Sequence, residues 1–89
     1  TQAYKFQGKY EEGIETAKKS LQISRQNKTF QGEITASLVL SEIYEQSGNY
    51  QKVISVAQPN IIQARKINQR DKEAQLQINL GNAYRVIGK

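Results

Sequence analysis

Residues 44–50 read YEQSGNY; YKFQGKY precedes them at residues 4–10 and YRVIGK follows at residues 84–89. The three segments are 40 residues apart. Each begins with a tyrosine and carries a glycine four residues later, which gives Tyr4, Tyr44, Tyr84, Gly8, Gly48 and Gly88. A fixed period in this range is typical of a solenoid, in which each unit buries its apolar face by stacking on its neighbours. The period therefore predicts a stack of similar units.

Glycine, asparagine and lysine mark the breaks between units, and apolar residues recur between the breaks at spacings of three and four. This spacing indicates helices, and no segment shows the strict alternation of a strand. We expect a helical stub at residues 1–7 and helices near residues 10–27, 30–47, 50–67 and 70–87. Glycine tolerates the left-handed conformation that often ends a helix, so each helix that reaches Gly8, Gly48 or Gly88 is expected to end there. The expected N-caps are Thr29 for the third segment and Asn68 or Asp71 for the fifth.

The apolar residues of each helix cover a wide arc, as expected of a helix with neighbours on two sides. The predicted core of helix 10–27 consists of Tyr10, Ile14, Ala17, Leu21 and Ile23. That of helix 30–47 consists of Ile34, Leu38, Leu40, Ile43 and Tyr44. Pro59 falls inside helix 50–67, where it removes one backbone hydrogen bond. We expect the helix to kink there by more than about 20° or to divide.

Composition excludes most catalytic chemistry. The chain has 89 residues, with no cysteine, no histidine and a single aspartate, Asp71. It therefore lacks thiolate ligands, disulfides and the commonest general base. Glu11, Glu12 and Glu15 are expected to form a solvated face near a helix N-terminus. We expect no catalytic residue, metal site, cofactor or enzyme activity, and no membrane partner because no apolar run reaches bilayer length.

The net charge of +5 raises the question of nucleic-acid binding. The basic residues form two clusters: Lys18, Lys19, Arg25 and Lys28, and Arg65, Lys66, Arg70 and Lys72. Arg25 and Arg65 both fall near the expected C-terminal end of a helix, where cations interact favourably with the helix dipole. We favour this structural explanation, and a phosphate-binding surface is the alternative.

The run Asn79-Leu80-Gly81-Asn82-Ala83-Tyr84, with Gly88 four residues later, resembles the first helix of a tetratricopeptide repeat. Residues 8–14 and 48–54 are similar to the start of that family's second helix. The resemblance implies that a small residue, Ser41 or Gly81, lets paired helices approach closely. The tyrosine three residues later, Tyr44 or Tyr84, then fills the gap beside it. The 40-residue period resembles the family's long-helix variant, since the usual unit has about 34 residues. A HEAT-like solenoid is a lesser alternative.

The resemblance implies that the first helices of successive repeats line a concave face that binds a peptide or a partner protein. The implied binding residues are Lys5, Phe6, Thr35, Leu38, Val39, Glu42, Glu45, Gln46, Gln75, Ile78, Asn79, Asn82, Arg85 and Val86. Asn79 and Asn82 can hydrogen-bond a peptide backbone, and Arg85 can bind a carboxylate. Val39 and Glu42 stand where a carboxylate clamp would need asparagine, which disfavours that mode of binding. Asn79 and Asn82 have the alternative role of solvated or helix-packing residues.

The sequence thus predicts an all-α, right-handed α-solenoid of antiparallel helix pairs that acts as a cytoplasmic protein-interaction module, scaffold or adaptor. Its expected organisation is the end of a first repeat at residues 1–29, a second repeat at residues 30–69 and the first helix of a third at residues 70–89. We expect it to be a piece of a longer array, with apolar surface open at both ends that favours self-association. A nucleic-acid-binding repeat and an oligomerisation segment are the alternatives.

Overall fold

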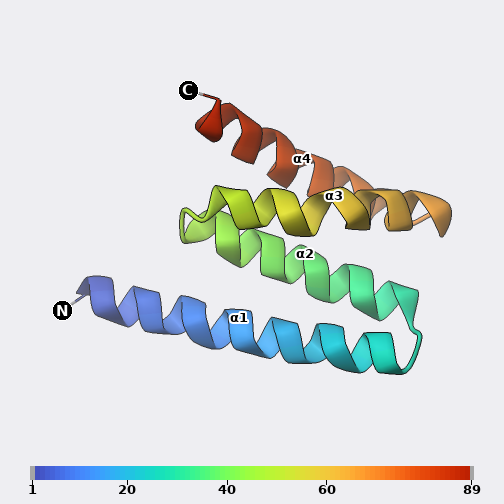
Figure 1. The fold of residues 1–89 in the computed structure, drawn as a ribbon, viewed down its shortest axis with the longest axis horizontal. Helices are drawn as coiled ribbons and strands as arrows, with labels where there is room; N and C mark the ends of the chain where they lie inside the picture. Colours follow the sequence, from blue (N-terminus) through green and yellow to red (C-terminus); the bar gives the residue numbers. More distant parts are fainter. Residues whose placement is uncertain (1, 89) are drawn as a thin grey trace.

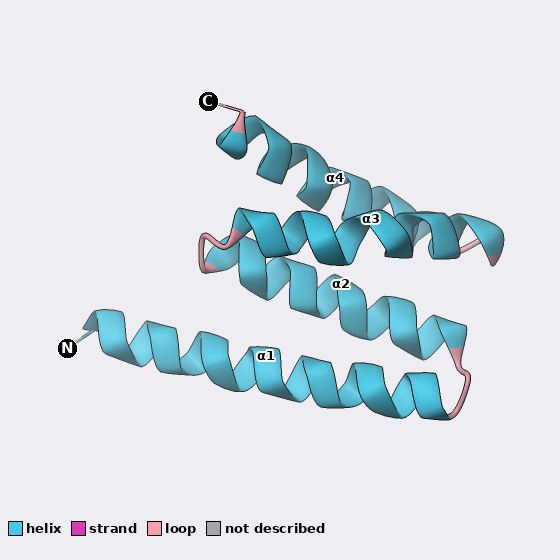
Figure 2. Cartoon of the chain, in the orientation of Figure 1, coloured by secondary structure: helices cyan, strands magenta, loops and turns pink. Residues whose placement is uncertain are grey.

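The computed structural model describes the backbone of residues 2–88 and the side chains of residues 9–88. Its four helices are α1 (Gln2–Gln26), α2 (Phe30–Gln46), α3 (Tyr50–Lys66) and α4 (Arg70–Ile87) (Figure 1). The described part of the chain contains no strand (Figure 2). The prediction of an all-α fold built from helix pairs is confirmed, and α2, α3 and α4 match the predicted ranges within one or two residues.

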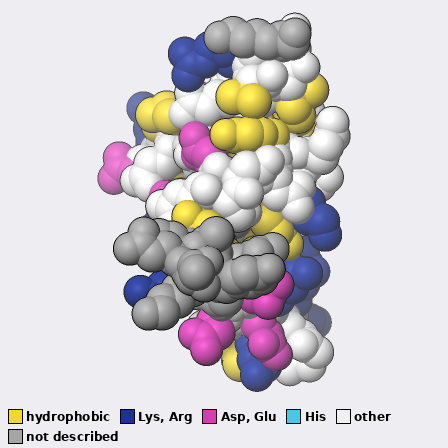
Figure 3. Space-filling view, turned by 90° about the vertical axis from the view of Figure 1, so that its left-hand side faces the viewer, with side chains coloured by type: hydrophobic (Ala, Val, Ile, Leu, Met, Phe, Trp, Pro, Cys, Tyr) yellow, Lys and Arg dark blue, Asp and Glu magenta, His cyan; other side chains and the backbone are white. Residues whose placement is uncertain are grey.

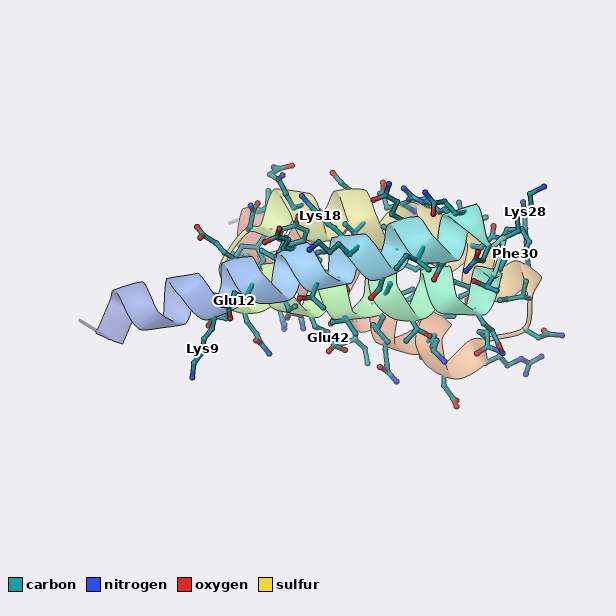
Figure 4. The ribbon with its side chains drawn as sticks, turned by 90° about the horizontal axis from the view of Figure 1, so that it is seen from below. Lys9, Glu12, Lys18, Lys28, Phe30 and Glu42 are labelled. Atoms are coloured by element: carbon teal, nitrogen blue, oxygen red, sulfur yellow. The ribbon has the colours of Figure 1, made fainter. Side chains whose placement is uncertain are left out.

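The helices stack in chain order, each beside the one before it, over a molecule of 42 × 31 × 17 Å. Seen from below, α3 lies above α2, whereas α4 starts below α2 (Figure 4). α2 packs directly on α4, whereas α1 and α3 make no close backbone contact over residues 2–88. The closer spacing of α2 and α4 makes their side the inner face of the stack.

The three turns share one geometry. The second residue after each helix end is left-handed, with φ of 56° at Lys28, 81° at Gly48 and 61° at Asn68. The next backbone N–H bonds the carbonyl five residues earlier, as from Asn49 to Tyr44 at 2.8 Å. This is the Schellman arrangement, which satisfies the last carbonyls of a helix. The role predicted for Gly48 is confirmed, and two non-glycine residues adopt the same conformation in the other turns.

The predicted break at Gly8 is wrong, because α1 runs without interruption from Gln2 to Gln26. A glycine inside a helix costs about 1 kcal/mol relative to alanine. A seven-residue stub folded back on itself would need a new nucleus, whereas continuing α1 adds one hydrogen bond per residue. Glu11, Glu12 and Glu15 therefore lie in the interior of α1 and not near its N-terminus. Gly88 also differs from expectation, with a right-handed φ of −69°.

The N-caps of α2 and α4 differ in part from the prediction. Thr29 is the N-cap residue of α2, as predicted, but its hydroxyl donates to the Ser24 carbonyl at 3.3 Å and caps no N–H of α2. The N-cap of α4 is Gln69, so the prediction of Asn68 or Asp71 is wrong. Asn68 is the left-handed residue of the turn, and Asp71 lies in the first turn of α4, where a carboxylate interacts favourably with the helix dipole.

Pro59 lies inside α3, which is continuous from Tyr50 to Lys66. The helix does not divide at this residue. Pro59 and Ser55, whose carbonyl would accept the missing hydrogen bond, are both exposed. Water can therefore solvate that carbonyl. The expected kink stays a prediction.

The core consists of two apolar clusters that follow the stack. One joins Ile34 and Leu38 of α2 to α3 and to Leu76 of α4. The other joins Ala17 of α1 to Tyr44, Val53 and Ala83. Ile23, predicted as core, is 56% exposed. Six residues further along a helix than the buried Ala17, Ile23 points about 120° away from it.

Candidate functional site

The side chains that the sequence assigned to partner binding come from α1, α2 and α4. Those of Lys5 and Phe6 lie outside the side chains that the structure describes. The remaining ones come from α2 and α4, which lie side by side. The structure therefore places the described candidates on two neighbouring helices.

Three polar contacts form a seam along the contact of α2 with α4. Asn79 Nδ2 donates to Ser41 Oγ at 3.0 Å, and Asn82 Nδ2 donates to Glu45 Oε1 at 3.1 Å. Arg85 donates to Asn82 Oδ1. The first two bonds join α4 to α2, and the third extends the second along α4. Both asparagines thus use an amide donor between helices, which is the helix-packing role that the sequence left open for them.

Burial divides the candidate residues into two groups. Leu38 packs in the core and Asn79 is 7% exposed, so neither offers much surface to a partner. Glu45 and Asn82 are half-buried along the seam. The exposed candidates are Thr35, Val39, Glu42, Gln46, Gln75, Ile78, Arg85 and Val86. We call these eight residues the exposed strip. It contains charged, polar and apolar side chains, and none of them belongs to the core.

The basic clusters are partly neutralised by the fold. Arg25 Nε lies 3.2 Å from Glu33 Oε1, and Arg65 Nε lies 3.0 Å from Glu73 Oε2. Each pair joins the end of one helix to the first turn of the next, at equivalent places in the 40-residue period. Arg25, Arg65 and Lys66 also occupy the last turns of α1 and α3. This placement agrees with the dipole explanation of the positive charge.

Two open grooves are not predicted by the sequence. One, of about 490 Å³, lies between α1 and α3 over Leu40 and Tyr44, with Lys18, Arg25 and Lys52 around it. Lys52 Nζ lies 5.8 Å from the centroid of the Tyr44 ring, a cation–π contact. Three cations therefore surround this groove, and its lining includes no acidic residue. Comparing residues 40 apart would have revealed which of these side chains have no covering neighbour.

The other groove, of about 520 Å³, lies between α1 and α2. Its walls include Gly13, Ala17 and Ser20 from α1 and Ala36, Val39 and Ile43 from α2. Lys9 and Glu12 at its edge lie on the same side of the molecule as Glu42, whereas Lys18 lies on the opposite side (Figure 4). We name this space the α1–α2 groove.

None of the four helices combines the length and the apolarity of a bilayer span, over the residues that the structure describes. Seen from the end where α1 begins, acidic side chains lie low on the molecule and at mid-height on its left, and hydrophobic ones gather towards the C-terminal end of α4 (Figure 3). The hydrophobic side chains exposed near that end include Tyr84, Val86 and Ile87.

Comparison with known proteins gives one match. The family model of the tetratricopeptide repeat matches residues 2–27. No curated protein matches the chain. The matched segment forms α1, and it includes Gly8, where the resemblance places a turn that the structure lacks. Over residues 2–27 the chain is thus similar to a tetratricopeptide repeat, and its four stacked helices form an all-α fold that is consistent with a helical-repeat solenoid.

Proposed function

We propose that the chain binds a peptide or a partner protein along the exposed strip of α2 and α4. Repeats of this type are in general protein-interaction modules. The observation that carries the proposal is the direct packing of α2 on α4 with the seam Ser41–Asn79 and Glu45–Asn82. The seam fixes the two helices relative to each other, so a partner meets a preformed surface and little ordering of the binding site opposes binding.

The chemistry of the strip specifies a partner of mixed character. Glu42 and Arg85 offer opposite charges, and Val39, Ile78 and Val86 offer aliphatic surface. An extended or helical peptide with spaced apolar side chains and charges of both signs fits these residues. A non-enzymatic scaffold or adaptor role in the cytoplasm belongs to the same proposal.

The test is a selection of peptides from a random display library, followed by affinity measurements on variants. Gln46→Arg and Gln75→Arg place bulky cations near the two ends of the strip. We expect each to weaken the affinity for the selected peptides by about tenfold, because blocking a contact that carries binding energy typically costs over 1 kcal/mol. Gln51→Arg, on the exposed side of α3, is the matched control and should leave affinity unchanged. Equal loss in all three variants, or no loss in any, would contradict the proposal.

Nucleic-acid binding by the basic clusters is the competing function. The same chain should show no retention on single- or double-stranded nucleic acid at physiological salt. Binding that falls steeply as salt rises would favour this alternative.

A further inference from the structure

The two ends of the stack are related by the 40-residue period. Residues of α1 and α2 correspond to residues of α3 and α4, and the α1–α2 groove corresponds to the space that α2 fills against α3 and α4. Val53, Leu76, Asn79 and Ala83 are buried there beneath α2. Their counterparts in the groove are Gly13, Ala36, Val39 and Ile43. Over residues 2–88 no helix covers this groove, and Val39 is 44% exposed.

The opposite end of the stack has the complementary surface. α4 corresponds to α2, the helix that fills the equivalent groove. In α2 the filling side chains are Ser37, Leu38, Ser41 and Tyr44, each at most 8% exposed. Their counterparts in α4 are Gln77, Ile78, Gly81 and Tyr84, all of which are exposed. We name these four residues the α4 face.

We propose that the α4 face of one copy of this chain docks into the α1–α2 groove of a second copy, in the register that α2 adopts against α3 and α4. The interface is head-to-tail, so each copy keeps one unused groove and one unused face. Such a contact does not close on itself and propagates the stack from copy to copy. This inference does not rest on the proposed function, but it uses Val39, Glu42, Ile78 and Arg85 as well, so a second copy and a peptide would compete for these residues.

Individual contacts support this register. Shifting the pair Ser41–Asn79 by one period places Gly81 of one copy against Val39 of the other. A Cβ atom at Gly81 would meet nothing within 4 Å in a single copy, so there is room for the valine. In the contact between copies, Gly81 and Val39 thus replace the hydrogen-bonded pair Ser41–Asn79. Neither has a polar side chain that the contact would leave without a partner.

The second shifted pair is complementary in charge. The internal bond from Asn82 to Glu45 becomes a pair between Glu42 of one copy and Arg85 of the other. Both side chains are exposed in the single copy, and Arg85 can bind a carboxylate in bidentate geometry. Opposite charges at matching positions favour this register over one shifted along the groove.

The α1–α2 groove and the internal contact have a floor of similar volume, although the large and the small residue have changed helices. Tyr44 packs in a cluster with Val53 and Ala83. In the shifted contact Tyr84 would meet Gly13 and Ile43, where the larger residue is on the other helix. Ile43 Cδ1 lies only 2.9 Å from the position of a Cβ at Gly13, so the isoleucine fills the space that the glycine leaves. The tyrosine therefore meets a floor of similar volume in both places.

The experiment uses the 89-residue chain and two variants, Val39→Glu in the groove and Ile78→Glu on the α4 face. The chain itself should show an average mass by sedimentation that rises with concentration beyond that of a dimer. Each variant should be monomeric over the same range, with association weakened at least about tenfold, because it buries a carboxylate without a partner. Circular dichroism should show unchanged helix content, since both positions are exposed.

Mixing the two variants separates a head-to-tail interface from a symmetric one. Val39→Glu retains an intact α4 face and Ile78→Glu an intact groove, so an equimolar mixture should form a 1:1 heterodimer and stop there. Phe30→Glu is the matched control: it removes an aromatic side chain that is 51% exposed at the start of α2. Its counterpart Arg70 stays exposed beside α2, so this variant should assemble like the original chain. A chain that is monomeric at all concentrations, or a mixture that stays monomeric, overturns the proposal.

Discussion

Asn79 Nδ2 donates a hydrogen bond to Ser41 Oγ over 3.0 Å, and both side chains are buried where α4 meets α2. Ser41 in turn donates to the Leu38 carbonyl at 2.9 Å, so the asparagine amide supplies the bond that the hydroxyl accepts. Asn79 thus holds two helices of neighbouring units together.

Replacing Asn79 by alanine should lower the free energy of unfolding by about 1–3 kcal/mol, because a buried hydroxyl loses its donor and a small cavity forms. Urea denaturation of the variant would measure this loss. Ser41→Ala combined with Asn79→Ala should cost less than the sum of the two single changes, since both remove the same bond. Strict additivity would show that the bond contributes no coupling energy.

Two glycines should respond to alanine with opposite signs. Gly48 has a φ of 81°, so Gly48→Ala should destabilise the chain by about 1–2 kcal/mol. Gly81 lies inside α4 with open space around it, so Gly81→Ala should stabilise by about 0.5–1 kcal/mol through helix propensity. Thermal unfolding of both variants, at a concentration where the chain is monomeric, provides the comparison. The same sign in both would contradict the assigned turn and helix roles.

Pro59→Ala should stabilise α3, since alanine restores the N–H that the Ser55 carbonyl lacks. The expected gain is about 1–3 kcal/mol, up to the full cost of proline inside a helix. Ile62→Ala, at a 55% exposed position of the same helix, serves as the control and should change stability by less than about 0.5 kcal/mol. Amide exchange near residues 55–59 should slow in Pro59→Ala, and unchanged exchange would mean that proline does not weaken the helix there.

The burial pattern predicts a large difference between two apolar truncations. Leu76 is fully buried between α2, α3 and α4, and Leu76→Ala should cost about 2–5 kcal/mol. Ile23 is more than half exposed, and Ile23→Ala should cost less than about 0.5 kcal/mol. Chemical denaturation of both tests this. A similar cost for the two would restore Ile23 to the core role that its spacing suggested.

The sequence correctly predicted the helices of residues 30–47, 50–67 and 70–87. The prediction failed at Gly8, although Gly8 and Gly48 have tyrosines at the same spacings before and after them. The outcome there depends on what a helix folded back at residue 8 would contact, and this lies beyond any local pattern. The assignment of Ile23 failed for a similar reason, because spacing alone does not say on which side of α1 the neighbour lies.

The candidate site was predicted at the level of helices and less well at the level of side chains. The structure confirms that α2 and α4 lie side by side. The sequence assigned Leu38 both to the core and to the binding face, and burial confirms the core role. The sequence could not show that Asn79 would be buried while Gln75 stays exposed, since that depends on the angle at which one helix packs on the next. The two grooves were missed because they depend on how α1, α2 and α3 pack together, which no local pattern shows.

The pairs Gly13–Ile43 and Val53–Ala83 have a consequence for anyone who would treat these units as interchangeable modules. Each pair divides a similar volume between two helices, but in opposite ways. A shuffled chain that combines helices from different units would set valine against isoleucine, which overcrowds the contact, or glycine against alanine, which leaves a void. The 40-residue period therefore repeats the volume of each contact but not the residues that fill it, so any rearrangement must transfer both members of a pair.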